Sequence, residues 1–296
     1  MSSATLGSSY RKQRQLLTLG FLIVPLGLLG TFTFLPLATM TGYSFQNWSG
    51  LGADRQWVGF DHYIRLFTDP EYFAVFGVSL YYLVGTFVQI GLALFFATLL
   101  SFKIVGRQFF KGVLFFPFLL NSVAVGFIFL FFFRPDGTLD TVLGALGLEG
   151  QIRFWLRDPS INNISLAFTS VWRYMGFNFI LFLGAIQSVP PSMYEAAELD
   201  GANRWQQFRF IIYPSIKRIV QLNVILGVRG AIAVFEIPYI MTLGNNGTET
   251  FVIQTVDTAF KFQRFGLASA MAIVLFLIII AISLVQRRLF ATESAA

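Results

Sequence analysis

Long runs of apolar residues alternate with short polar stretches along this chain. A transmembrane helix needs about 20 consecutive, mainly apolar residues. Runs of that kind lie at 16–39, 73–100, 112–133, 164–188, 216–236 and 266–285. Because only helices and closed barrels satisfy the backbone inside a bilayer, this pattern predicts an all-α integral membrane protein with six transmembrane helices.

Composition supports the same class of protein. The 296 residues are 55% hydrophobic and only 12% charged, whereas about 25% charged residues is usual in soluble domains. The first apolar run is too long for the apolar core of a signal peptide, so we expect it to be retained as a span. We therefore expect one transmembrane domain over residues 16–290, with polar tails at 1–15 and 291–296.

The net charge of +6 follows the connections between the runs, so it does not indicate a nucleic-acid partner. Basic residues gather before the first run, in the second and fourth connections, and after the last run. The other connections mix basic and acidic residues. By the positive-inside rule, both termini and the fourth connection, 190–214, are expected on the cytoplasmic side.

The fourth connection carries the signals of a short, capped helix. Ser192 and Glu195 have the spacing of a capping box, in which each side chain binds a backbone amide of the first helical turn. Gly201 then suits the left-handed conformation that ends a helix. This pattern predicts a first short helix that begins at Ser192 and stops near Asp200.

A second N-cap follows directly. Asn203 precedes Gln206 by three residues, which predicts a further short helix that ends before Pro214. Two rigid helices between two spans would transmit a push from a cytoplasmic partner into the membrane. The small side chains of Ala196 and Ala197 suit insertion into a protein groove better than they suit anchoring on the inner leaflet.

Polar side chains interrupt three of the apolar runs, at Asn121, Arg173, Asn178, Arg229 and Glu236. An arginine inside a span costs at least about 2.5 kcal/mol when it faces lipid, so these residues should face protein or water. Arg229 and Glu236 are two turns apart, which would place them on one face of a helix, about 10 Å apart. They either line a polar substrate path or form ion pairs, such as Arg173 with Glu236, that fix the packing.

The sequence contains no pattern typical of an enzyme. Metal-protease, nucleophile-elbow and phosphate-loop motifs are absent, and the chain has no cysteine and one histidine. We therefore expect transport without catalysis, and neither a cofactor nor a metal held by this chain. An ion-coupled carrier of small polar solutes is the alternative, although it should show more intramembrane carboxylates and an inverted repeat.

The fourth connection resembles the EAA loop of inner-membrane permease subunits of bacterial ABC importers. The matching residues are Tyr194-Glu195-Ala196-Ala197, Asp200-Gly201-Ala202, Phe208, Ile211 and Pro214. Segments 155–159 and 181–190 are similar to the carbohydrate branch, of the MalF and UgpA type, and the likeness covers roughly residues 16–290. The chain departs from that branch at Gly244-Asn245-Asn246, where many sugar permeases have Gly-Gly-Pro.

The resemblance implies a multi-pass subunit of the bacterial inner membrane that imports an oligosaccharide or sugar derivative. Its partners would be a second homologous permease, an external sugar-binding protein, and two cytoplasmic ABC ATPase subunits that hold ATP and Mg. The residues expected to couple to the ATPase are Tyr194, Glu195, Ala196, Ala197, Asp200, Gly201, Phe208 and Pro214. Asn121, Arg173, Asn178, Arg229 and Glu236 are substrate-path candidates chosen by burial chemistry and not by a matched motif.

Overall fold

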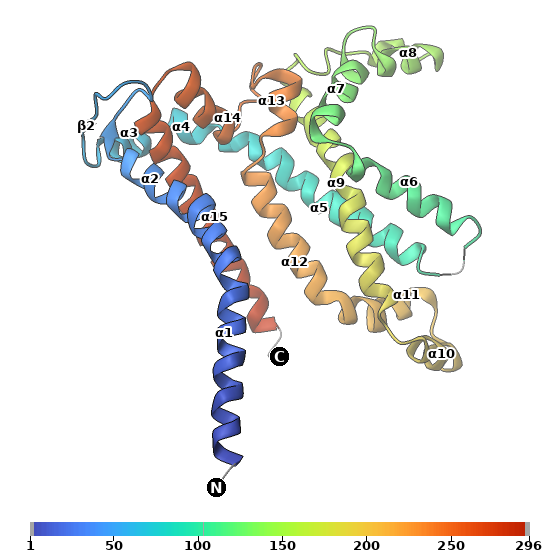
Figure 1. Cartoon of the computed structure of the whole chain (residues 1–296). Coiled ribbons are helices and arrows are strands. Elements are labelled where there is room, and N and C mark those ends of the chain that lie inside the picture. Colours follow the sequence, from blue (N-terminus) through green and yellow to red (C-terminus); the bar gives the residue numbers. More distant parts are fainter. Residues whose placement is uncertain (1–2, 103, 294–296) are drawn as a thin grey trace. The chain divides into compact units, whose positions relative to one another are not determined.

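The computed structural model describes residues 3–102 and 104–293, and helices make up most of this range (Figure 1). The chain divides into two compact units. The first contains the residues up to Thr68 together with Thr255–Val274, and the second contains Asp69–Gln254 together with the residues from Leu275 onward. The two units are described separately.

The first unit holds the first apolar run. Its elements are α1 (Ser3–Leu29), a π-helical turn (Gly30–Phe34), α2 (Leu35–Tyr43), the strands β1 (Gln46–Asn47) and β2 (Gln56–Trp57), α3 (Asp61–Thr68), a second π-helical turn (Asp257–Lys261) and the start of α15 (Phe265–Glu293). The two strands pair antiparallel, with Gln46 opposite Trp57. Helix α1 already begins at Ser3, so residues 3–15 are helical and lead directly into the first apolar run.

The segment that contains the strands is tied to the start of α15 by close backbone contacts. The Gly266 amide donates to the Trp48 carbonyl at 3.2 Å, and a His62 ring nitrogen lies 3.1 Å from the Gln46 carbonyl. The Arg55 guanidinium stacks on the Trp48 ring, 4.3 Å from its centroid. The aromatic residues of this connection are therefore held together by packing within the unit.

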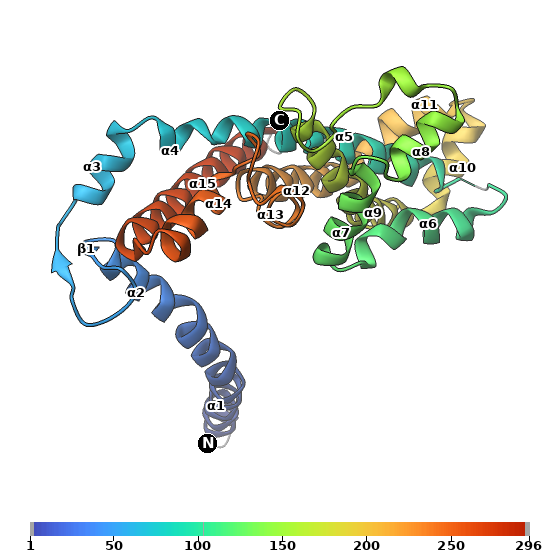
Figure 2. The same cartoon turned by 90° about the horizontal axis from the view of Figure 1, so that it is seen from above.

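The second unit is a bundle built around α9 (Asn162–Gln187), which packs against α5, α6 and α12. Its other elements are α4 (Glu71–Ala74), α5 (Phe76–Leu99), α6 (Arg107–Leu119), α7 (Ser122–Phe133), α8 (Thr138–Ala145), a 3-10 turn (Glu149–Gln151), α10 (Pro191–Leu199), α11 (Arg204–Gln207), a π-helical turn (Phe208–Ile212), α12 (Tyr213–Ile232), α13 (Glu236–Thr242) and the start of α14 (Phe251–Val256). Helices α7 and α13 lie side by side (Figures 1 and 2).

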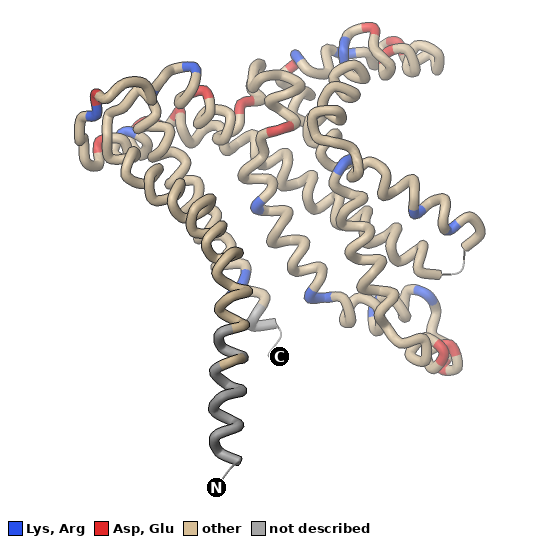
Figure 3. The backbone as a smooth tube through the Cα atoms, in the orientation of Figure 1, with Lys and Arg blue, Asp and Glu red and all other residues tan. Residues whose placement is uncertain are grey.

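Charge is distributed in the second unit as a bilayer requires. Lysine, arginine and carboxylate residues gather at the α8 end and at the α10 end of the bundle, with few between them (Figure 3). Two apolar clusters fill the interior. One lies around Phe129, Leu166 and Ile237, and the other lies around Phe179, Ile212 and Ile216.

The third apolar run is not one continuous helix, which differs from the prediction. Helices α6 and α7 meet at 99°, and the turn between them contains Asn121. Pro117 removes a backbone donor in the last turn of α6, and the Asn121 side chain accepts from the Val123 amide at 2.8 Å to cap α7. Within the described residues, five helices are therefore long and apolar enough to cross a membrane, or six if this bent pair counts as one span.

Candidate functional site

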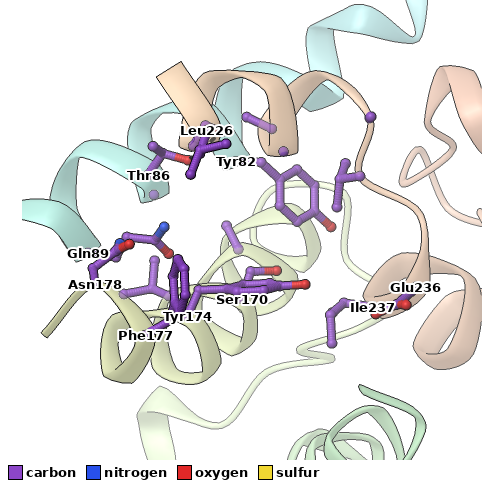
Figure 4. A pocket seen from close by; sticks show the side chains of 18 of the residues that line it. Tyr82, Thr86, Gln89, Ser170, Tyr174, Phe177, Asn178, Leu226, Glu236 and Ile237 are labelled. Atoms are coloured by element: carbon purple, nitrogen blue, oxygen red, sulfur yellow. Dashed lines mark hydrogen bonds between the residues drawn. The ribbon is translucent and has the colours of Figure 1, made fainter. Parts of the chain in front are cut away.

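A cavity of about 550 Å³ lies in the second unit between α5, α9, α12 and the start of α13 (Figure 4). Small residues make room for it where the helices approach, including Gly85 on α5 and Gly227 and Gly230 on α12. Its size falls within the range of about 300–1,000 Å³ that is typical of small-molecule sites. Gln89 and Asn178 lie at one end of the cavity and Glu236 at the other (Figure 4).

Four of the side chains that line the cavity bring buried polar atoms without a partner among residues 3–102 and 104–293. These atoms are the Tyr82 hydroxyl, the Ser170 hydroxyl, the Asn178 amide nitrogen and the Asn223 amide oxygen. The Asn223 amide nitrogen donates to the Ile219 carbonyl at 2.8 Å, which fixes the orientation of that side chain. Buried polar groups are normally hydrogen-bonded, so these four atoms can bind a polar molecule in the cavity.

An ion pair stands at the Glu236 end. The Arg173 guanidinium lies 3.2 Å from the Glu236 carboxylate and donates to the Tyr174 hydroxyl at 2.9 Å. The Arg173 side chain is 12% exposed and that of Glu236 is 52% exposed. Among the described residues that line the cavity, Glu236 is the only charged one, and Arg173 balances its charge.

The structure brings three of the predicted path residues together. Asn178 and Glu236 line the cavity, and Arg173 contacts Glu236, as one of the two sequence interpretations expected. Asn121 instead caps α7, and Arg229 is exposed on α12 and is not among the lining residues.

The inference that Arg229 and Glu236 share one helical face was wrong. Helix α12 ends at Ile232, and α13 begins at Glu236, so the two residues belong to different helices. The break is supported by Thr250, whose hydroxyl donates to the Val234 carbonyl at 2.8 Å and satisfies an acceptor released from the helix.

The capping of α10 also differs from the prediction. The helix begins at Pro191 with Pro190 as its N-cap residue, and no side-chain cap bond forms there among the described residues, so the Ser192 and Glu195 capping box is absent. A proline suits the first helical position because its fixed φ is already helical and its missing amide needs no partner. The helix therefore starts one residue early, and Ser192 lies inside its first turn.

The C-terminal end of α10 is as predicted. Gly201 has a φ of +76°, which is the left-handed conformation that glycine adopts readily. The Ala202 amide donates to the Ala197 carbonyl at 2.9 Å, and the Gly201 amide donates to the Glu198 carbonyl at 3.1 Å. These two bonds form a Schellman motif, which stops the helix and turns the chain sharply.

The second predicted cap is confirmed, but the helix that follows it is longer than predicted. The Gln206 amide donates to the Asn203 side chain at 2.9 Å, and the Asn203 amide donates to the Gln206 side chain at 2.7 Å. The helical segment that begins with α11 does not end before Pro214. It continues through the π-helical turn into α12, where Pro214 lies in the first turn.

The loop formed by α10 and α11 is anchored by two aromatic residues, and Gln207 is its one buried residue among those described. Tyr194 and Phe208 pack against the apolar cluster around Ile212, and burial raises the pKa of the Tyr194 hydroxyl. All of α10 belongs to the described range, and none of its residues is buried. Leu199, at the end of α10, is 90% exposed. A short helix that has no buried residue and ends in an exposed leucine can serve as a contact site.

Sequence reasoning missed several lining residues. Gln89 and Asn223 are polar positions within apolar runs, a signal that could have identified them in the same way as Asn178. Tyr82 and Ser170 gave no such signal, because tyrosine and serine are common in membrane helices.

Comparison of the sequence with known proteins identifies the family of this chain. A family model described as "Binding-protein-dependent transport system inner membrane component" matches residues 89–292. The chain is 33% identical over 276 residues to the probable ABC transporter permease protein YurN of Bacillus subtilis, with 91% of this chain and 94% of that protein covered. It is 32% identical over 272 residues to the multiple sugar-binding transport system permease protein MsmF of Streptococcus mutans, with 91% and 93% covered.

Solved structures agree on the fold. A chain of the bacterial alginate ABC transporter, solved in complex with an alginate pentasaccharide-bound periplasmic protein, matches with a TM-score of 0.82 at 20% identity, over 93% of each chain. A second structure, of a bacterial ABC transporter involved in the import of the acidic polysaccharide alginate, matches with a TM-score of 0.81 at 20% identity, over 94% of this chain and 96% of that one.

Proposed function

We propose that this chain, which belongs to the family of binding-protein-dependent transport system inner membrane components, imports a sugar, either an oligosaccharide or a sugar derivative. Family membership makes the chain a permease subunit of an ABC importer and not an enzyme. This assignment replaces the alternative interpretation of the sequence as an ion-coupled carrier. The sugar assignment is supported by the name of the Streptococcus mutans relative and by the cavity, whose aromatic and hydrogen-bonding groups suit the faces and edges of a sugar ring.

The cavity forms this chain's part of the translocation path. Asn178 and Glu236 contact the substrate, and Arg173 holds Glu236 in place. A second homologous permease supplies the opposite wall, and a sugar-binding protein delivers the substrate at the α8 end of the second unit. Asn121 and Arg229 lie away from the cavity and receive no role in the path.

Helix α10 couples the path to ATP hydrolysis. It enters a groove of a cytoplasmic ATPase subunit, one of two that bind ATP and Mg, and Glu195 pairs there with a basic residue. Ala196 and Ala197 allow close approach, and Asp200 and Gly201 end the helix sharply. Tyr194 and Phe208 transmit the displacement to the bundle because they pack on its apolar core. Closure of the ATPase pair then shifts the path between inward-facing and outward-facing states. Both termini lie in the cytoplasm of a bacterial cell.

The observation that carries this proposal is the exposed α10, which ends in a Schellman motif, in a chain of this family. The test is sugar-stimulated ATP hydrolysis by the reconstituted importer with Glu195→Lys. Loss of one partner of a buried charge pair typically costs about 2–5 kcal/mol, and lysine also brings a like charge to the basic partner, so stimulation should fall at least tenfold. Glu195→Gln is the comparison variant, because it removes the charge of Glu195 without reversing it and keeps the size of the side chain. An assembled Glu195→Lys importer with wild-type stimulation would contradict the assignment.

A further inference from the structure

We propose that the cavity between α5, α9 and α12 selects an uncharged, hydroxyl-rich part of the substrate, and that Tyr82, Asn178 and Asn223 set this selectivity. The inference rests on the proposed function as a sugar permease and narrows its substrate class. Two observations carry it: the arrangement of the unpartnered polar atoms and the charge balance of the lining.

The three side chains present both halves of a hydrogen-bonding pattern. Tyr82, Asn178 and Asn223 are 4%, 5% and 2% exposed and come from three different helices. The Asn178 nitrogen is a donor, the Asn223 oxygen is an acceptor, and the Tyr82 hydroxyl can act as either. A sugar carries several hydroxyls that each donate and accept, so it can satisfy groups of both kinds. A carboxylate only accepts and would leave the Asn223 oxygen without a donor.

The charges of the lining do not suit an acidic ligand. Glu236 contributes the only ionised group among the lining residues that the structure describes. The nearby cation, Arg173, is already engaged by the Glu236 carboxylate and the Tyr174 hydroxyl. An acid moved from water into this space would meet the Glu236 carboxylate and no positive charge beyond the one that Arg173 already gives to Glu236, and a buried, uncompensated charge is strongly unfavourable.

Aromatic residues complete the site. Phe118 and Phe177 lie with ring centroids 4.9 Å apart on the wall of the cavity. Their apolar faces suit the C–H faces of a sugar ring, while the amide and hydroxyl groups suit its edge. The solved importer with this fold that carries an acidic polysaccharide shows that the fold itself does not impose neutrality. The preference must come from the side chains of this chain.

The test measures binding to the importer assembled from this chain, its second permease and the ATPase subunits in nanodiscs, without a binding protein to select the ligand. Equilibrium dialysis is performed with labelled glucose, lactose, maltotriose and diacetylchitobiose, and with glucuronate and an alginate disaccharide as acidic probes. We expect saturable binding of at least one neutral probe and none of the acidic probes.

The variants locate the binding. Tyr82→Phe removes a single oxygen atom and should weaken the binding of the neutral probe roughly 2- to 12-fold, and Asn178→Leu should weaken it to a similar extent. Tyr81→Phe is the matched control, because Tyr81 is the adjacent residue on α5, is 40% exposed and is not part of the cavity lining. It should bind like the wild type.

Three results would overturn the inference: an acidic probe that binds as well as the neutral ones, no saturable binding of any neutral probe, or identical affinities for Tyr82→Phe and Tyr81→Phe. None of these changes the outcome of the Glu195→Lys experiment. If Glu195→Lys abolishes stimulated hydrolysis while Tyr82→Phe leaves the affinity for the neutral probe unchanged, the permease assignment stands and only the proposed selectivity fails. If no sugar stimulates ATP hydrolysis at all, the proposed function itself fails.

Discussion

Replacement of Gly176 by alanine should destabilise the second unit, because α9 and α6 approach each other at this glycine. A Cβ atom at position 176 would lie 2.6 Å from the Leu114 carbonyl oxygen and 3.2 Å from the Phe115 Cα atom. Both are backbone atoms, so no side-chain rotation can relieve the contact, and the helices must move apart. Overpacking of this kind costs about 1–3 kcal/mol, while alanine in a helix interior gains about 0.5–1 kcal/mol over glycine. The net effect is a loss of about 1 kcal/mol, and of at most about 2.5 kcal/mol.

Gly184 provides the matched control on the same helix. No described atom beyond its own stretch of helix lies within 4 Å of a Cβ at position 184, so Gly184→Ala should stabilise the protein by about 0.5–1 kcal/mol. The assay is reversible denaturant unfolding of the permease in mixed micelles, followed by tryptophan fluorescence. A Gly176→Ala variant as stable as Gly184→Ala would refute the close packing of α6 on α9.

Three further predictions concern the ion pair and the loop. Glu236→Gln should lower the free energy of unfolding by about 1–2 kcal/mol, because it leaves the mostly buried Arg173 without a counter-charge. Arg173→Gln should lower it by less, because Glu236 is half exposed. A double-mutant cycle measures the coupling between the two residues, and additive effects would contradict the ion pair. Asn203→Ala should destabilise the start of α11 by about 1 kcal/mol, which is measured as faster amide hydrogen exchange. Ser192→Ala should leave α10 unchanged, because Ser192 forms no cap in the described structure. Equal effects of the two variants would show that Ser192 does cap α10. Gly201→Ala should loosen the end of α10 by about 1–2 kcal/mol through its left-handed φ alone, since no other described atom crowds that position; unchanged exchange at Gly201 would argue against the motif.

The helices were largely predictable from the sequence, but the breaks within them were not. Hydropathy measures only whether a residue is apolar, and it stays high across the α6 and α7 junction and across the end of α12. Both breaks depend on hydrogen bonds that the pattern cannot show. One is the cap that Asn121 gives to Val123. The other joins Thr250 to the Val234 carbonyl, 16 residues away.

The candidate site was predictable where its chemistry interrupts an apolar run. Asn178, Arg173 and Glu236 could be selected because amide and charged groups are costly in lipid. Arg229 was misplaced because the argument from helical phase assumed an unbroken helix. Tyr82 could be identified only from the structure, because its significance lies in a buried hydroxyl on a cavity between α5, α9, α12 and the start of α13.

The most direct test of the account is sugar uptake into proteoliposomes that contain the assembled importer, its binding protein outside and ATP inside. The account predicts uptake that requires both ATP and the ATPase subunits, and that persists when ionophores abolish every ion gradient. Uptake by the permeases alone, driven by a proton or sodium gradient, would contradict it.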